Sequence, residues 1–196
     1  MTTANPGPSQ PQHWSAYLGS PSGALLSGHG KYRTLLWRTF GIGGDAAPLV
    51  FVMLNPSTAD MHNDDNTIRR CLSFAHREGA GGILVVNLCA FRTKSPQLLK
   101  DAKRRGEDVV FAGENDHQIK LAVARGSVVL AWGDNARGPD WLAQRRADVC
   151  GMVLANGRHP LCLGRTKHGE PRHPLFVRRD APLDRFRDQS HLTVTR

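Results

Sequence analysis

Two side-chain amides and one imidazole stand where they could handle a water molecule or a nucleobase. Asn55 follows the apolar run PLVFVML, Asn87 follows the run GILVV, and His173 precedes a proline in a late basic loop. An amide offers both donors and acceptors, so either asparagine could orient a water molecule or pair with the edge of a base. Each could instead do no more than cap a turn, as asparagine before proline often does, and that alternative stays open.

Carboxylates cluster shortly after the first asparagine, in the segment DMHNDD. The three acids of this segment are Asp60, Asp64 and Asp65. Asp65 or the asparagine after it could also accept backbone N–H bonds as the cap of a helix. Together with His62, the three acids are a conceivable Mg²⁺ or Mn²⁺ site, but their spacing matches no established ligand pattern. We therefore predict no metal and no cofactor.

The elements that must carry these residues follow from apolar patterns and turn signals. Runs that are apolar on both faces predict strands inside a sheet, whereas a single apolar stripe predicts a helix packed on it. Strands are predicted over residues 32–40, 48–54, 82–86, 127–133 and 161–163, and helices over 66–78, 96–104, 114–125 and 141–154. Residues 41–48 are predicted to form a hairpin-like loop between the first two strands.

Strands that alternate with helices predict a three-layer α/β/α sandwich with a mostly parallel central sheet. In such sheets, ligands bind beyond the carboxyl ends of the strands. Asn55, Asn87, the turn after Trp132 and the loop around His173 are therefore expected to converge at one edge of the sheet.

The composition predicts one domain with two tails. We expect a flexible tail over residues 1–23, a single α/β domain over 24–178 and a basic tail over 179–196. The four cysteines are scattered and form no CxxC pair, which predicts reduced core residues; an iron–sulfur cluster is the alternative. No apolar run is long enough to span a membrane, and the N-terminus has no secretory signature, so a cytoplasmic protein is expected.

The charge balance favours a polyanionic partner. The chain has 26 Lys and Arg against 17 Asp and Glu, a formal net charge of +9. A dense basic segment near the late histidine is suited to phosphate contact, and its members are Arg165, Lys167, Arg172 and Arg178. DNA or a nucleotide is therefore the predicted partner.

Five motifs in order resemble a bacterial and phage family catalogued as a domain of unknown function, number 1643. They are LNPSTAD, DDNTIRRC, NLCAFR, AWG and TKHGEPRHPLF, and the resemblance covers roughly residues 30–178. It names a family without naming an activity.

The same order of signals is more distantly similar to the uracil-DNA glycosylase superfamily. LNPS at 54–57 resembles its water-handling motif at Asn55, and Asn87 with Arg92 resembles its base-reading asparagine and the arginine after it. VVLAWG at 128–133 resembles its LWG strand, and His173-Pro174 resembles its His-Pro loop, although Leu175 stands where that loop usually has serine.

This second resemblance implies a uracil-DNA glycosylase-like fold and a set of roles. Asn55 would hold the attacking water, His173 would stabilise the leaving base, and Asp60, Asp64 or Asp65 would supply the carboxylate. The implied base and substrate contacts are Pro56, Ser57, Asn87, Arg92, Trp132, Gly133 and Pro174. Arg69 is a further predicted contact, although the segment MHNDDNTIRRC that contains Arg69, Asp64 and Asp65 is peculiar to family 1643 and departs from the glycosylase pattern.

The expected function is hydrolysis of the N-glycosidic bond of a nucleobase, possibly a modified one, in DNA or a nucleotide. The alternative is a binding module for nucleic acid or a nucleotide that has the same pocket but no turnover. Salt titration would separate a polymeric ligand from a monomeric one, because only a duplex contacted through many phosphates gives a steep dependence.

Overall fold

A seven-stranded mixed sheet forms the centre of the protein. The computed structural model describes residues 20–41, 46–57, 59–60 and 62–187. Along these residues the strands are β1 (Ser22–Ser27), β2 (Tyr32–Thr39), β3 (Leu49–Met53), β4 (Gly82–Asn87), β5 (Ser127–Leu130), β6 (Leu161–Cys162) and β7 (Asp184–Arg185). The α-helices are α1 (Asn66–Arg77), α2 (Pro96–Arg104), α3 (Ala112–Val123) and α4 (Asp140–Ala155), and two 3-10 turns are η2 (Asp134–Ala136) and η3 (Pro174–Phe176).

The sheet is parallel in its middle and antiparallel at both edges. Its order is β1-β2-β4-β3-β5-β6-β7. Strands β4, β3, β5 and β6 run parallel, whereas β1, β2 and β7 join by antiparallel pairing. The predicted α/β class is confirmed, and the predominance of parallel strands holds for the four central ones.

The predicted hairpin between the first two strands is wrong. β2 pairs with β1 and with β4, and β3 lies on the far side of β4. The true hairpin partner, β1, was not predicted, because Ser22–Ser27 is short and begins with Ser-Gly, which reads as a loop.

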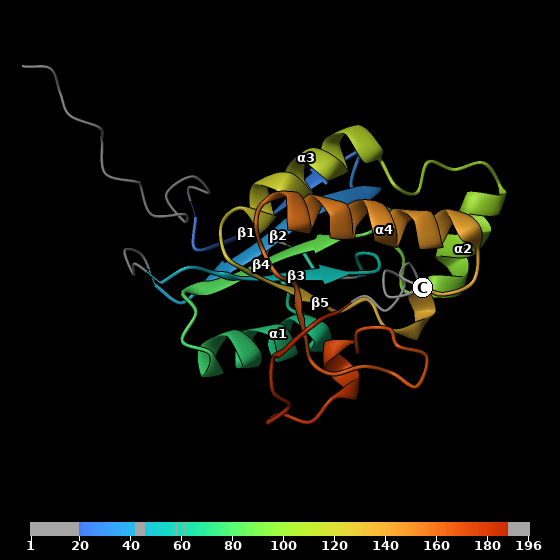
Figure 1. Ribbon diagram of the computed structural model, residues 1–196. Coiled ribbons are helices and arrows are strands. Elements are labelled where there is room, and N and C mark those ends of the chain that lie inside the picture. Colours follow the sequence, from blue (N-terminus) through green and yellow to red (C-terminus); the bar gives the residue numbers. More distant parts are fainter. Residues whose placement is uncertain (1–19, 42–45, 58, 61, 188–196) are drawn as a thin grey trace, which may run out of the picture.

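Helices cover both faces of the sheet, as the three-layer prediction requires. α1 lies on one face, with the orange-red chain of residues 160–187 beside it, and α3 and α4 lie on the other (Figure 1). Alternate strand residues serve the two layers: Phe51 and Val85 pack in the cluster with α1, whereas Val50 and Leu84 pack in the cluster with α3 and α4. Both clusters are closed to solvent at these positions.

Helix caps explain where two of the helices begin. The Asp65 Oδ1 atom accepts the Ile68 N–H at 2.9 Å, which fixes the start of α1. Ser95 caps α2 in the same way through Gln97, and Pro96 occupies the first turn, where its missing N–H costs nothing.

The structure extends the ordered sheet beyond the predicted domain limits of 24–178. β1 begins at Ser22, and β7 pairs with β6 inside the segment expected as a basic tail. Residues 1–19 and 188–196, where the rest of the predicted tails fall, lie outside the described residues. In the part of the chain that is described, no helix combines the length and apolar character needed to cross a membrane.

Two of the four cysteines lie on opposite faces of the sheet. Cys71 belongs to the apolar cluster with α1, and Cys89 to the cluster on the opposite face of the sheet. Burial raises the pKa of both thiols, that of Cys89 to about 12, so they stay protonated. This arrangement fits core residues and not a four-cysteine cluster.

A glycine at the entry of β5 tests the central strand order. A Cβ atom on Gly126 would lie 1.9 Å from the Pro48 carbonyl oxygen, at the start of β3. We expect Gly126→Ala to lower the free energy of unfolding by about 2–3 kcal/mol, because backbone must move where β3 and β5 meet. Chemical denaturation of the variant and wild type measures this.

The control is Gly151→Ala on the exposed surface of α4, where an added Cβ meets nothing within 4 Å. This change should stabilise the protein by about 0.5–1 kcal/mol, since alanine favours a helix over glycine. Equal effects of the two substitutions would contradict the adjacency of β3 and β5.

Candidate functional site

A pocket of about 270 Å³ opens at the carboxyl ends of the central strands. Its wall contains Asn55 after β3, Trp132 after β5, and His173 in the loop before η3. The prediction that these distant residues converge is therefore confirmed for these three. Further lining comes from the polar residues Arg33, Ser57, Asp65, Thr67, Thr93, Lys94 and Asn135, and from apolar side chains that include Leu175 and Phe176.

Asn55 is held in one orientation. Its Nδ2 atom donates to the carbonyl oxygens of Thr93 at 2.8 Å and Pro56 at 3.0 Å. Both amide hydrogens are thereby used, and Oδ1 is left as an acceptor at the pocket. An acceptor there can bind the hydrogen of a water molecule and leave the water's lone pairs free to attack.

His173 is neutral and presents a donor. Its Nδ1 atom accepts the Leu175 N–H at 3.3 Å, so in the neutral ring the proton lies on Nε2. Burial lowers the pKa of His173 to about 4, and the negative charge of Asp65 opposes this only in part. The side chain therefore offers an uncharged N–H near neutral pH.

A glycine allows the late histidine to approach the end of β5. Gly133 has φ 69°, and a Cβ atom there would lie 3.3 Å from the His173 Cβ. The Gly133 N–H donates to the Pro171 carbonyl at 2.9 Å, which ties the His173 loop to this turn.

Glu170 provides a second tie between the same segments. Its Oε2 atom accepts the Trp132 Nε1–H at 2.8 Å, and its Oε1 atom pairs with Arg146 of α4. The indole ring is thus fixed where it lines both this pocket and a neighbouring one beside α4.

Of the three predicted carboxylates, only Asp65 reaches the pocket. Its Oδ1 atom caps α1, and its charge acts on both Arg33 and His173. Asp60 instead accepts the backbone N–H groups of His62 and Asn63 at 2.9 and 3.0 Å, and these bonds lower its pKa.

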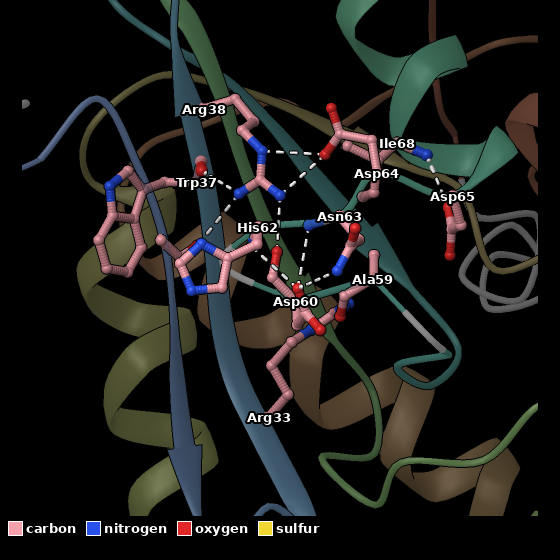
Figure 2. Close-up of polar contacts among 11 residues, drawn as sticks. Arg33, Trp37, Arg38, Ala59, Asp60, His62, Asn63, Asp64, Asp65 and Ile68 are labelled. Atoms are coloured by element: carbon pink, nitrogen blue, oxygen red, sulfur yellow. Dashed lines mark hydrogen bonds and ion pairs between the residues drawn. The ribbon is translucent and has the colours of Figure 1, made fainter.

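Asp64 is bound to a neighbouring strand. Its Oδ1 atom lies 2.9 Å from Arg38 Nε, and the same guanidinium donates to the Asp60 carbonyl at 2.6 Å (Figure 2). Asp60 and Asp64 therefore shape the loop before α1, and neither lines the pocket. Within the described residues, no three His, Cys, Asp or Glu side chains form a group that could hold a metal ion.

The structure does not bring Asn87 or Arg92 to the pocket. Asn87 is fully buried, and its Oδ1 and Nδ2 atoms have no hydrogen-bond partner among the described residues. Arg92 donates through Nη1 to the Gly30 carbonyl at 3.0 Å and so holds the turn between β1 and β2. Neither residue is part of the pocket wall.

The other predicted contacts are divided. Ser57 and Trp132 line the pocket, and Pro56 contributes the carbonyl that holds Asn55. Pro174 is buried and accepts Arg70 through its carbonyl, at 3.4 Å. Arg69 points away and bonds to Asn66 on the exposed side of α1.

Two of the four predicted phosphate contacts lie beside the site. Lys167 and Arg172 line a second pocket of about 420 Å³, which shares Trp132, Asn135, His173 and Phe176 with the first. Arg165 stacks on Phe186, with its guanidinium carbon 4.4 Å from the ring centre. Arg178 forms an ion pair with Asp180.

Arg33 is the main site residue that was not predicted. It lies in β2, and only 2 % of its surface is exposed, yet it lines the pocket. The sequence signal that could have identified Arg33 is its place in the largely apolar predicted strand YRTLLWRTF. Charged side chains are seldom fully buried unless they are paired, so an arginine in a buried strand suggests a functional role.

Comparisons with known proteins support a family but no named activity. No curated protein and no solved structure matched the chain. One family model, described as Protein of unknown function (DUF1643), matches residues 33–175. The match runs from Arg33 to Leu175 and includes every residue of the pocket wall except Phe176. Because it covers well over half of the 196 residues, the chain belongs to the DUF1643 family.

Proposed function

We propose that this protein hydrolyses the N-glycosidic bond of a nucleobase, in DNA or in a nucleotide, and that its site is related to that of uracil-DNA glycosylases. The observation that supports the proposal most strongly is that one pocket is lined both by Asn55, whose Nδ2 group is fully engaged so that Oδ1 remains as an acceptor, and by His173, whose neutral ring provides a donor. A pocket of about 270 Å³ is small, as a site for a single ring should be.

The leaving base is the first requirement of this reaction. The bond between C1′ of the sugar and the base nitrogen breaks with both electrons going to the base, which becomes an anion. The His173 Nε2–H would donate to an oxygen of that base and stabilise the developing charge without transferring its proton. Such fixed donors in a partly dehydrated site are strong contributors to catalysis.

The attacking water is the second requirement. Asn55 Oδ1 would accept one hydrogen of the water and so direct its oxygen toward C1′. An amide cannot remove a proton, so the proton goes to the carboxylate of Asp65, whose Oδ1 atom alone is engaged in the helix cap. The proton then passes to the base anion, and the products are a neutral base and a sugar hydroxyl.

The second pocket supports a substrate that carries phosphate. Lys167 and Arg172 line it, and it adjoins the first pocket along His173 and Phe176. A phosphate next to the cleaved nucleoside would meet these cations, and the net charge of +9 favours such a ligand.

Base release is the direct test. Purified protein is offered oligonucleotides and nucleotides with uracil, mismatched thymine or modified bases, and the free base is quantified by chromatography. We expect His173→Ala to lower the rate by about 10²–10³, as loss of a charge-stabilising donor does. Asn55→Ala should lower it by a similar factor, because the water is no longer oriented.

His117→Ala and Asn156→Ala are the matched controls, since both residues are exposed on helix surfaces or ends away from the pocket. They should retain the wild-type rate. If wild type releases no base from any of these substrates, the proposal of catalysis fails. Pocket-dependent binding without release would then favour the non-catalytic module.

The pH dependence of release distinguishes a neutral donor from a charged acid. Because the pKa of His173 is lowered from 6.5 to about 4, the ring is neutral on both sides of pH 6.5. We therefore expect that ionisation of His173 causes no change in kcat/KM between about pH 5.5 and 8. A tenfold fall for each pH unit above 6.5 would show instead that the protonated imidazole is required.

A further inference from the structure

A bulge in β2 directs Arg33 into the pocket. Leu25 of β1 pairs with Leu35, but the next residue, Leu26, pairs with Arg33, so Thr34 is the extra residue. An extra residue in a strand interrupts the alternation of side chains, so that residues beyond the bulge face the opposite side of the sheet from the one they would face in a regular strand. Leu35 packs with the α3 and α4 cluster, whereas Arg33, two positions earlier, faces Asp65 and the pocket.

The guanidinium of Arg33 is buried without an acidic partner. Its Nη1 atom donates to the Ala59 carbonyl at 2.7 Å, and its Nε atom has no hydrogen-bond partner. It forms no salt bridge with any described residue. A buried charge that is not paired is costly and is rare unless function requires it.

The surrounding charges do not neutralise Arg33. Asp65 and Asp60 act favourably on it, while Arg92 and Arg38 oppose it, and burial is the largest influence on its pKa, which falls to about 10. Asp65 is also committed to the N-terminus of α1. With Lys94 on the wall, the pocket holds two cations and one carboxylate.

We propose that Arg33 makes the pocket an anion site, so that the group seated in it carries a carboxylate or a comparable oxyanion. This rests on the proposed function only in assuming that the group is a nucleobase. The substrate class is then a base with an acidic substituent, and Arg33 is the residue that distinguishes it from an ordinary neutral base.

A pair of ligands that differ in charge but hardly in size tests this. Calorimetric titration of the full-length protein compares uracil-5-carboxylate with uracil-5-carboxamide. We expect the acid to bind about 10- to 100-fold more tightly, as a hydrogen-bonded charge pair provides. In Arg33→Met this preference should disappear, and in Arg33→Lys part of it should remain.

Arg38→Met is the matched control on the same strand. Arg38 is 8 % exposed but is paired with Asp64, away from the pocket. Its loss should lower the melting temperature and leave the preference for the acid intact. Arg33→Met should melt no lower than wild type without ligand, because it removes an unpaired buried charge.

Equal binding of acid and amide by wild type, failure of the acid to bind, or a preference that survives Arg33→Met would each overturn the inference. Inorganic phosphate forms a third arm, and if it displaces the acid at equal concentration, the anion is a phosphate and the assignment to the base is overturned. The titration needs no turnover, so its result is independent of whether base release is found.

Discussion

Parallel pairing of β3 with both β4 and β5 is the constraint on which the pocket depends. Val50 lies between Leu84 and Val128, so the three strands end at nearly the same level of the sheet. The chain must then leave each strand at one edge, and the polar residues that follow β3 and β5 meet there. The His173 loop reaches the same edge because Gly133 and Glu170 tie it to the turn after β5.

Polar groups at this edge are buried at a cost that the fold only partly offsets. The Nδ2 group of Asn55 is satisfied by two carbonyls, and the guanidinium of Arg38 by Asp64 and the loop before α1. Arg33 Nε and the Asn87 amide are not satisfied by any described residue. Unpaired buried groups of this kind are uncommon in a stable core and concentrate where a protein binds or reacts. Of these two residues, Arg33 lines the pocket.

Sequence patterns predicted most elements because the central strands are apolar on both faces and two of the four helices, α1 and α2, carry clear caps. They also predicted that Asn55, Trp132 and His173 converge, which follows from strand ends in a parallel sheet. They did not predict β1, because this strand is short and begins with Ser-Gly. They did not predict the position of Arg33, because a β-bulge turns a residue to the other face of the sheet and leaves no signal in the sequence pattern. Asn87 ends its strand as predicted, yet its side chain is fully buried beside the strand residue Met53 and is not part of the pocket wall.

The state of one imidazole tests the central claim most directly. Among the nine histidines of the chain, His173 should appear in ¹⁵N-edited NMR spectra at pH 6 as the neutral ring with its proton on Nε2. Addition of a free nucleobase should shift the Nε2–H signal of His173 and leave the exposed histidines unchanged. A His173 ring that titrates near pH 6.5 like an exposed histidine, and does not respond to any base, would contradict the account.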